Sequence, residues 1–263
     1  MTVRDALAET ERRLAAAGVD TPRVDAEWLV AHVLGVPRTR IREHAEVDGD
    51  ALEPLVRRRE AREPLAYVLG DWGFRRLTLK TDRRALVPRP ETEIAVDRAL
   101  AVIRDVRAPR VLDVGVGSGA IALSIADEHP DARLTGVDTS AEALALAREN
   151  AERLGLEVEL RQAGIEAAAE GWELVVANPP YVRPEEWDAL QPEIRDWEPK
   201  AALVGEGIHE QLARAARTTW LVLEVGDGQA GPLALLLAAE GYFEIRISPD
   251  LGGRQRVVEG RRA

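Results

Sequence analysis

A strand, a glycine-rich turn and a helix follow one another directly from residue 110 to residue 127, and this run constrains the fold more than any other stretch. The apolar residues 111–114 predict the strand, residues 115–119 the turn and residues 120–127 the helix. Glycines permit a sharp turn and let a ligand approach the backbone. The run also fits a loose dinucleotide-binding pattern, although several cofactors use this architecture. We therefore expect an α/β fold that binds a cofactor at the turn.

A second strand end adds a carboxylate to the predicted ligand site. The predicted strand 133–137 is followed at once by Asp138. An acidic side chain in this place suits hydrogen bonds to both hydroxyls of a ribose. The two strand ends therefore predict an adenosine-type ligand, and its expected binding residues are Asp113, Gly115, Val116, Gly117, Ser118, Gly119 and Asp138.

The tetrapeptide Asn178-Pro179-Pro180-Tyr181 follows another apolar strand, residues 172–177. Two prolines stop a strand because neither has an N–H, and each restrains the residue before it to extended conformations. Such a stiff turn would hold the Asn178 side chain and the Pro179 carbonyl at the carboxyl end of the sheet, where open α/β folds bind ligands. A turn that only ends the strand is the simpler interpretation, but the glycine-rich turn upstream favours a site.

The glycine turn, the acidic strand end and the tetrapeptide together indicate S-adenosylmethionine and methyl transfer to a planar nitrogen. An amide nitrogen is a poor nucleophile because its lone pair is delocalised into the carbonyl. If the Asn178 oxygen and the Pro179 carbonyl accept its two N–H bonds, they orient the lone pair and stabilise the positive charge of the transition state. We expect Asn178, Pro179 and Tyr181 to be catalytic and Pro180 to line the substrate site with them. We also expect Asn178 to contact the cofactor and no metal to be required.

The chain divides into three parts by pattern. Residues 1–70 have helical spacing and predict a small helical bundle, and residues 71–86 predict a β-hairpin linker. Residues 87–263 predict a Rossmann-like α/β domain whose last two strands form an antiparallel pair. Its seven expected strands are 111–114, 133–137, 157–161, 172–177, 221–225, 242–247 and 255–259.

Two connecting segments carry further expectations. The prolines of Pro88-Arg89-Pro90 fix an extended segment before a helix that runs to residue 104. This segment is either a rigid linker or a loop folded over the cofactor, and we include its three residues among the cofactor-binding candidates. Residues 184–199 are acidic and contain two tryptophans, which predicts a surface loop over the site.

Composition narrows the functional classes. The formal net charge of −11 argues against a nonspecific nucleic-acid binder, which needs a basic face. There is no cysteine for a disulfide, zinc cluster or thiol nucleophile, and the four histidines are scattered without ligand spacing. The first residues lack the apolar core of a signal peptide, and no apolar run reaches membrane-spanning length. We expect a cytoplasmic monomer that binds neither membranes nor nucleic acid directly.

The sequence resembles the HemK/PrmC family, protein-(glutamine-N5) methyltransferases that act on class I peptide chain release factors. The resemblance covers nearly the whole chain and includes Arg62–Gly70, Val87–Glu93, Asp113–Ala122, Asn178–Tyr181, Glu198–Leu203, Leu223–Gly226 and Gly253–Val258. It implies a helical domain that helps to dock the release factor, with the glutamine of its Gly-Gly-Gln loop as the target. It also implies that residues 115–119 and Asp138 hold S-adenosylmethionine, and that residues 178–181 hold the glutamine.

Some positions depart from the family pattern. Ala163 and Gly164 stand where members usually have an aspartate and an aromatic residue that contact adenine, and we keep Gly164 as a cofactor-binding candidate. Val116 replaces a common threonine. These changes leave open a degenerate member that binds the translation machinery without catalysis.

Three other functions also remain open. The same tetrapeptide would serve a ribosomal-protein glutamine methyltransferase, and in an adenine-N6 nucleic-acid methyltransferase it would grip a flipped base. The acidic net charge and the lack of a basic recognition domain weigh against the nucleic-acid enzyme. An NAD-dependent oxidoreductase would explain the glycine turn but would leave Asn178 to Tyr181 without a role.

Overall fold

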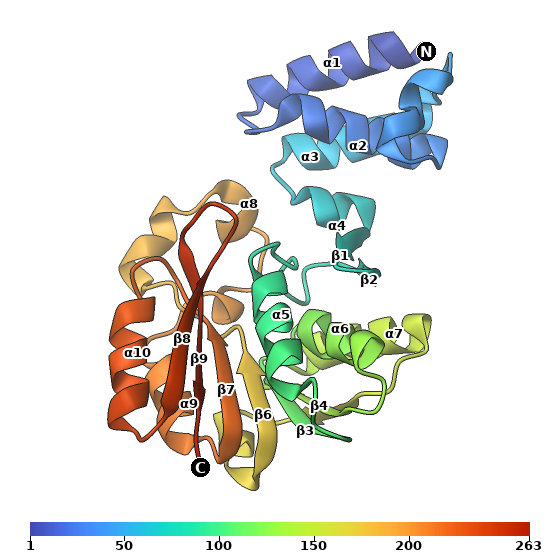
Figure 1. Ribbon diagram of the computed structural model, residues 1–263. Helices are drawn as coiled ribbons and strands as arrows, with labels where there is room; N and C mark the ends of the chain where they lie inside the picture. The colour runs from blue at the N-terminus through green and yellow to red at the C-terminus, as the bar shows by residue number, and fades with distance from the viewer. The chain divides into compact units, whose positions relative to one another are not determined.

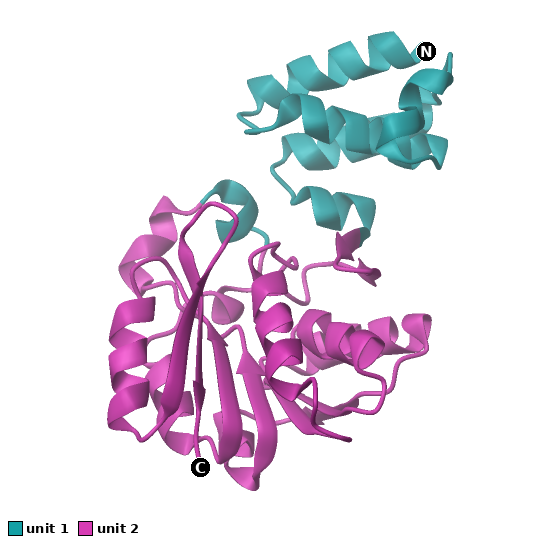
Figure 2. Cartoon of the chain, viewed as in Figure 1, with its two compact units in different colours: residues 1–71, 191–197 teal, residues 72–190, 198–263 magenta.

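The computed structural model describes residues 1–263, which form two compact units. Residues 1–71 and 191–197 form unit 1, and residues 72–190 and 198–263 form unit 2 (Figure 2). No helix in either unit combines the length and the apolar character that a membrane crossing requires.

Unit 1 is helical, as its sequence spacing predicts (Figure 1). Its apolar faces pack into one core that includes Leu14, Leu29 and Val30, all fully buried. Helix ends follow the local signals: the Thr2 hydroxyl accepts from the Asp5 N–H, and Gly35 closes a helix in the left-handed conformation. The helices are α1 (Val3–Ala16), α2 (Pro22–Leu34), the 3₁₀ helix η1 (Arg38–Glu43), α3 (Gly49–Glu60) and α4 (Leu65–Leu69).

A short segment from much later in the chain completes unit 1. Helix α8 (Pro192–Arg195) supplies Glu193, whose carboxylate accepts hydrogen bonds from Arg59 at 2.8 Å and from Arg62 at 2.6 Å. Arg59 also donates to Asp25 at 2.7 Å, and both members of that pair are almost fully buried. Residues 191–197 lie within the acidic stretch predicted as a surface loop. The structure instead gives this part of the stretch a helix and charged partners in unit 1.

Unit 2 is built on a seven-stranded sheet in the order β5-β4-β3-β6-β7-β9-β8 (Figure 1). β9 is antiparallel to both of its neighbours, and the other pairs are parallel. The strand order reverses between β3 and β6, which makes their carboxyl ends the topological switch point where such sheets bind ligands. The strands are β3 (Arg110–Val114), β4 (Arg133–Asp138), β5 (Glu159–Gln162), β6 (Trp172–Ala177), β7 (Thr218–Glu224), β8 (Phe243–Pro249) and β9 (Gln255–Arg261).

Helices cover both faces of the sheet because successive strand residues point to opposite sides. One core contains Val111, Leu174 and Val222, together with buried residues of α5 (Thr92–Ile103), α6 (Ala120–Glu128) and α7 (Ala141–Leu154). The other contains Leu112 and Val175, together with residues of α9 (Ile208–Ala215) and α10 (Ala230–Ala239). The remaining helices of unit 2 are the short 3₁₀ helices η2 (Ile165–Glu170), η3 (Pro184–Ala189) and η4 (Lys200–Ala202).

The predicted fold class is confirmed, and the differences are local. The hairpin strands β1 (Asp71–Phe74) and β2 (Leu77–Lys80) pair as expected. The strand expected at 157–161 occupies 159–162 instead. Helix α9 was not predicted, although Ile208 and Leu212 have helical spacing and Leu212 is fully buried.

Candidate active site

The two sequence motifs meet at the switch point of the sheet. Val114 is the register partner of Ala177, so the glycine turn after β3 and Asn178 after β6 leave the sheet at neighbouring positions. Ala177 is in turn the partner of Leu223, so Asn178 and Glu224 lie at the same level of β6 and β7. The ends of β3, β6 and β7 therefore meet at the site, and β4, which pairs with β3 on the other side, adds Asp138.

The glycine turn has a backbone conformation that favours glycine. Gly115, Gly117 and Gly119 all have φ between +55° and +90°, a region that residues with a Cβ rarely adopt. A Cβ on Gly115 would meet no atom within 4 Å, whereas one on Gly119 would lie 2.7 Å from Leu123 Cδ1. Gly119 thus permits close packing of α6, and the space beside Gly115 is open to a bound group.

Asp138 braces the turn. Its Oδ2 accepts the Gly117 N–H at 3.0 Å, and its Oδ1 accepts the Ser140 N–H at 2.9 Å. The carboxylate is partly exposed at the end of β4, beside the turn, as the ribose assignment requires. Each of its oxygens retains a second lone pair that a ligand hydroxyl can use.

Asp113 is a buried carboxyl with one unused oxygen. Its Oδ2 accepts the Ala122 N–H at 3.0 Å, but its Oδ1 has no hydrogen-bond partner. Burial, with a smaller contribution from the charge of Asp138, raises the pKa of Asp113 to about 7. A positively charged cofactor would stabilise the ionised form. The orphan oxygen and the open glycine turn therefore fit a cationic cofactor.

Asn178 is held by a residue from a distant element. Its Nδ2 donates to the hydroxyl of Thr92 at 3.1 Å, 86 positions away. Thr92 is buried at the start of α5. Neither the side-chain oxygen of Asn178 nor the carbonyl oxygen of the buried Pro179 accepts a side-chain hydrogen bond within the chain. Both oxygens therefore remain as acceptors for a substrate.

Tyr181 is fixed against the loop after β7. The Gln229 side chain donates to the Tyr181 carbonyl at 3.1 Å and accepts the Gly226 N–H at 3.0 Å. A Cβ on Gly226 would lie 3.0 Å from the Tyr181 ring, so only glycine fits there without displacement. Burial, and to a lesser degree the charge of Glu224, raises the pKa of Tyr181 to about 12. Its hydroxyl therefore stays protonated at neutral pH.

Pro180 packs beside the segment that follows η4. A Cβ on Gly205 would lie 2.9 Å from Pro180 Cβ, and Val182 forms a parallel bridge with Val204. These contacts hold the end of the tetrapeptide and the residue after it against residues 204–205. The turn is therefore restrained along its whole length.

The proline segment before α5 is anchored by a buried ion pair. Arg89 donates to both oxygens of Glu198 at 2.7 Å, and the Glu198 side chain is 1% exposed. Burial raises the pKa of Glu198, although Arg89 opposes the shift. Pro88 is buried and Pro90 is exposed on either side of Arg89. Because Thr92 directly continues this segment, its anchoring also positions the partner of Asn178.

The predicted adenine-contact positions have no polar side chain to offer. Ala163 donates its N–H to the Asp138 carbonyl at 3.2 Å and packs against the second core. The Gly164 N–H is taken by the Glu166 carboxylate at 2.8 Å. Ala163 and Gly164 can therefore offer an adenine ring only backbone groups and apolar surface.

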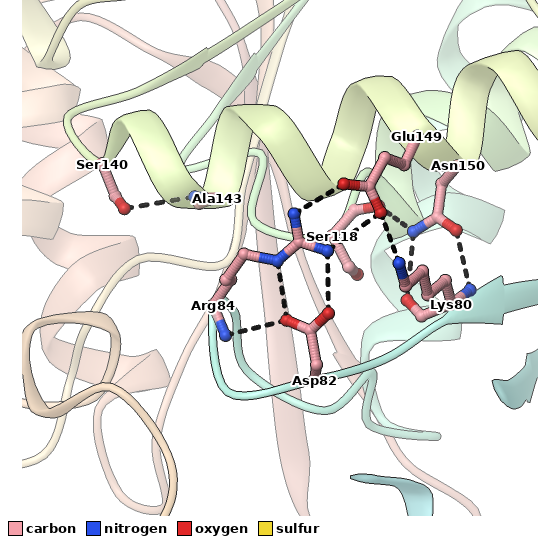
Figure 3. Close-up of polar contacts among 8 residues, drawn as sticks. All are labelled: Lys80, Asp82, Arg84, Ser118, Ser140, Ala143, Glu149 and Asn150. Atoms are coloured by element: carbon pink, nitrogen blue, oxygen red, sulfur yellow. Dashed lines mark hydrogen bonds and ion pairs between the residues drawn. The ribbon is translucent and has the colours of Figure 1, made fainter. Parts of the chain in front are cut away.

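Asn150 is a site-supporting residue that sequence reasoning missed (Figure 3). It is fully buried on α7, and its Nδ2 donates to the carbonyls of Ser118 at 2.9 Å and Lys80 at 3.1 Å. Its Oδ1 accepts the Lys80 N–H at 2.7 Å. One amide thus ties the glycine turn to β2. A polar residue among the apolar positions of a helix was the available signal.

Comparisons with known proteins agree on the family. Residues 5–70 match the family model of the PrmC N-terminal domain, and residues 95–194 match that of the methyltransferase small domain. A release factor glutamine methyltransferase of Deinococcus radiodurans is 41% identical over 279 residues, which cover 100% of this chain and 99% of that protein. Its counterpart in Geobacter sulfurreducens is 37% identical, over 99% of this chain and 96% of that protein.

A solved structure shares the fold. The hMettl16 catalytic domain, in complex with a MAT2A 3′UTR hairpin, aligns with a TM-score of 0.56 and 13% identity. The alignment covers 70% of this chain and 74% of that one. At this identity the likeness supports the α/β architecture of unit 2 alone.

Proposed function

Because the chain belongs to the release factor glutamine methyltransferase family, we propose that it methylates the side-chain amide nitrogen of a glutamine in class I peptide chain release factors. The target is the glutamine of the Gly-Gly-Gln loop, and the methyl donor is S-adenosylmethionine. The observation that carries the proposal is the position of Asn178 directly beside the glycine turn, at the switch point of the sheet. A planar amide held by Asn178 and a cofactor held by the glycine turn would lie side by side there.

The residues of the site divide between two tasks. The glycine turn 115–119, Asp138 and Asp113 would hold the cofactor, which supplies an activated methyl group on a sulfonium. The segment 88–90 and Gly164 would close the cofactor site from other sides. The chain itself has to align the acceptor nitrogen, since an activated donor needs mainly orientation.

Alignment of the glutamine falls to the tetrapeptide. The Asn178 oxygen and the Pro179 carbonyl accept the two N–H bonds of the substrate amide, which fixes the plane of that amide. Both acceptors also stabilise the positive charge that grows on the nitrogen. Tyr181, held by Gln229, packs against the substrate plane. The nitrogen lone pair then faces the methyl group.

Unit 1 is proposed to dock the release factor, because it matches the PrmC N-terminal model and carries no part of the tetrapeptide or glycine turn. We propose a monomer that acts in the cytoplasm and requires neither metal nor nucleic acid.

The proposed substrate is tested by comparing methyl transfer to three acceptors with the same labelled donor. We expect transfer to a class I release factor and none to ribosomal proteins or adenine-containing DNA or RNA. Transfer to either alternative, with the release factor unmodified, would contradict the proposal.

Cofactor affinity is expected to depend on pH through Asp113. Because the pKa of Asp113 is about 7, its carboxyl is mostly protonated below pH 7. It must then lose a proton before it can pair with a cationic cofactor. The affinity should therefore fall about tenfold for each pH unit below 7 and level off above it. Calorimetric titration of S-adenosylmethionine from acidic to alkaline pH measures this trend. The Asp113→Asn variant should show weaker binding with no such slope, and a sloped curve in that variant would refute the assignment.

A further inference from the structure

We propose that residues 198–205, called the bracket below, position the tetrapeptide from both of its ends, and that Glu198 orients Asn178. The proposal rests on the proposed glutamine methylation and deepens it with a positioning role for a segment outside the cofactor and substrate sites. Residues 198–203 are part of the family pattern, yet they include none of the residues assigned to cofactor or substrate. In this mechanism Glu198 contacts neither molecule and acts on Asn178 through intervening residues.

Three successive contacts connect Glu198 to Asn178. Arg89 Nη2 donates to both carboxylate oxygens of Glu198 at 2.7 Å. The Arg89 carbonyl accepts the Thr92 N–H at 3.1 Å. The Thr92 hydroxyl accepts from Asn178 Nδ2 at 3.1 Å, which leaves the amide oxygen pointing away from Thr92. The buried carboxylate therefore acts, through the start of α5, on the side chain proposed to hold the glutamine.

Burial makes the Glu198 anchor rigid. The Glu198 side chain is 1% exposed, so its charge cannot turn out into water and must keep Arg89 as its partner. Arg89 is itself 30% exposed and would otherwise be free to move. Pro88 and Pro90 lock φ on either side of it, so a fixed side chain also restrains the backbone of the segment. The carbonyl that receives the Thr92 N–H is thereby held in place.

The other end of the bracket pairs with the residue that follows the tetrapeptide. Val182 donates its N–H to the Leu203 carbonyl at 2.9 Å, and its own carbonyl accepts the Gly205 N–H at 3.2 Å. A Cβ on Gly205 would lie 2.9 Å from Pro180 Cβ and 3.0 Å from the Pro180 oxygen. The absence of a side chain at Gly205 therefore lets the bracket approach Pro180 this closely.

A single turn joins the two ends of the bracket. Ala202 donates its N–H to the Pro199 carbonyl at 2.9 Å, around the 3₁₀ helix η4, so the spacing between the two ends is fixed. The tetrapeptide between them has few conformations of its own, because its two prolines lock φ. Held at both ends, it keeps the Asn178 oxygen and the Pro179 carbonyl at a constant separation. Alignment of a planar amide requires this constancy.

The bracket is tested with the full-length protein, a class I release factor and saturating S-adenosylmethionine. Glu198→Gln keeps the shape of the side chain but loses its charge, and it should lower kcat about tenfold, the scale of one hydrogen bond to a charged group. The matched control is Glu259→Gln. Glu259 is 3% exposed and accepts from Arg98, also on α5, at 2.5 and 2.7 Å. Because that ion pair holds a later part of α5, its loss should lower thermal stability to a similar degree but leave kcat unchanged.

A double-mutant cycle separates positioning by Glu198 from a merely structural role. Thr92→Val removes the hydroxyl that receives the Asn178 amide and should itself lower kcat, whereas Thr92→Ser should restore most of the rate. If Glu198 acts through Thr92, adding Glu198→Gln to Thr92→Val should cause almost no further loss. Losses that multiply in the double variant would overturn the assignment of Glu198.

Gly205→Ala probes the other end of the bracket. The φ of Gly205 is not positive, so only the contact with Pro180 opposes the new methyl group. We expect a lower kcat with unchanged cofactor affinity, measured by calorimetry, because the methyl group displaces Pro180 and not the glycine turn. Gly231→Ala on α10 is the matched control: a Cβ there would meet no atom within 4 Å, and kcat should stay at the wild-type value.

The results distinguish failure of the bracket from failure of the proposed function. Wild-type kcat in both Glu198→Gln and Gly205→Ala would overturn the bracket, while methylation by the wild-type protein would still stand. An equal loss of kcat in Glu259→Gln would show that Glu198 only stabilises the fold. If the wild-type protein transfers no methyl group to the release factor, the proposed function fails and the bracket fails with it.

Discussion

Replacement of Asn178 by alanine is expected to lower kcat for glutamine methylation by about two to three orders of magnitude, the typical cost of removing one preorganised group that stabilises transition-state charge. The residue supplies the only side-chain acceptor in the proposed glutamine grip. It also fixes the position of the acceptor nitrogen, so its loss removes both orientation and charge stabilisation. Steady-state kinetics with a class I release factor would measure the effect.

Cofactor binding serves as the internal control for that variant. Asp113, the glycine turn and Asp138 do not depend on the Asn178 side chain for their hydrogen bonds, so affinity for S-adenosylmethionine should be largely retained. Gln211→Ala removes an exposed amide from α9 and should leave kcat unchanged. Normal turnover by Asn178→Ala would refute the proposed role of the tetrapeptide.

The Asn150→Asp substitution should destabilise the protein strongly although it changes the shape of the side chain very little. Asn150 is fully buried and donates to two carbonyl oxygens, which a carboxylate would repel instead. Loss of both bonds and burial of a charge should cost about 3 kcal/mol or more. For a unit of this size the melting temperature should fall by roughly 6–12 °C, as measured by calorimetry.

The adjacent residue provides the matched control. Glu149 pairs with Lys80 and Arg84 at 2.7 Å but is about 40% exposed (Figure 3). Glu149→Gln should therefore leave the melting temperature nearly unchanged, because exposed ion pairs contribute little to stability. Cofactor affinity should also fall in Asn150→Asp alone, because only Asn150 holds the Ser118 carbonyl of the glycine turn. Equal stability of the two variants would contradict the role assigned to Asn150.

Much of the fold could be read from local sequence signals. The strands before the glycine turn and before Asn178 are short apolar runs ended by glycine or proline, and both form as predicted. Because parallel strands end on the same edge of a sheet, these two motifs could also be placed together. The register of Val114 with Ala177 shows how close their ends are.

The residues that support the site could not be found in this way. Thr92 and Glu224 look like an ordinary helix start and strand end; only the folded chain brings the Thr92 hydroxyl to Asn178 and Glu224 to the same level of the sheet. Glu193 lies 134 positions from Arg59, so no local pattern links α8 to unit 1. Helix α9 was missed although Ile208 and Leu212 have helical spacing, because it spans only eight residues.

The most direct test of the central claim is peptide mapping by mass spectrometry after incubation of a purified class I release factor with this protein and S-adenosylmethionine. We predict the gain of one methyl group, located on the glutamine of the Gly-Gly-Gln loop and absent when Asn178→Ala replaces the wild-type protein. A release factor without the methyl group, in the presence of protein shown separately to bind the cofactor, would contradict the account.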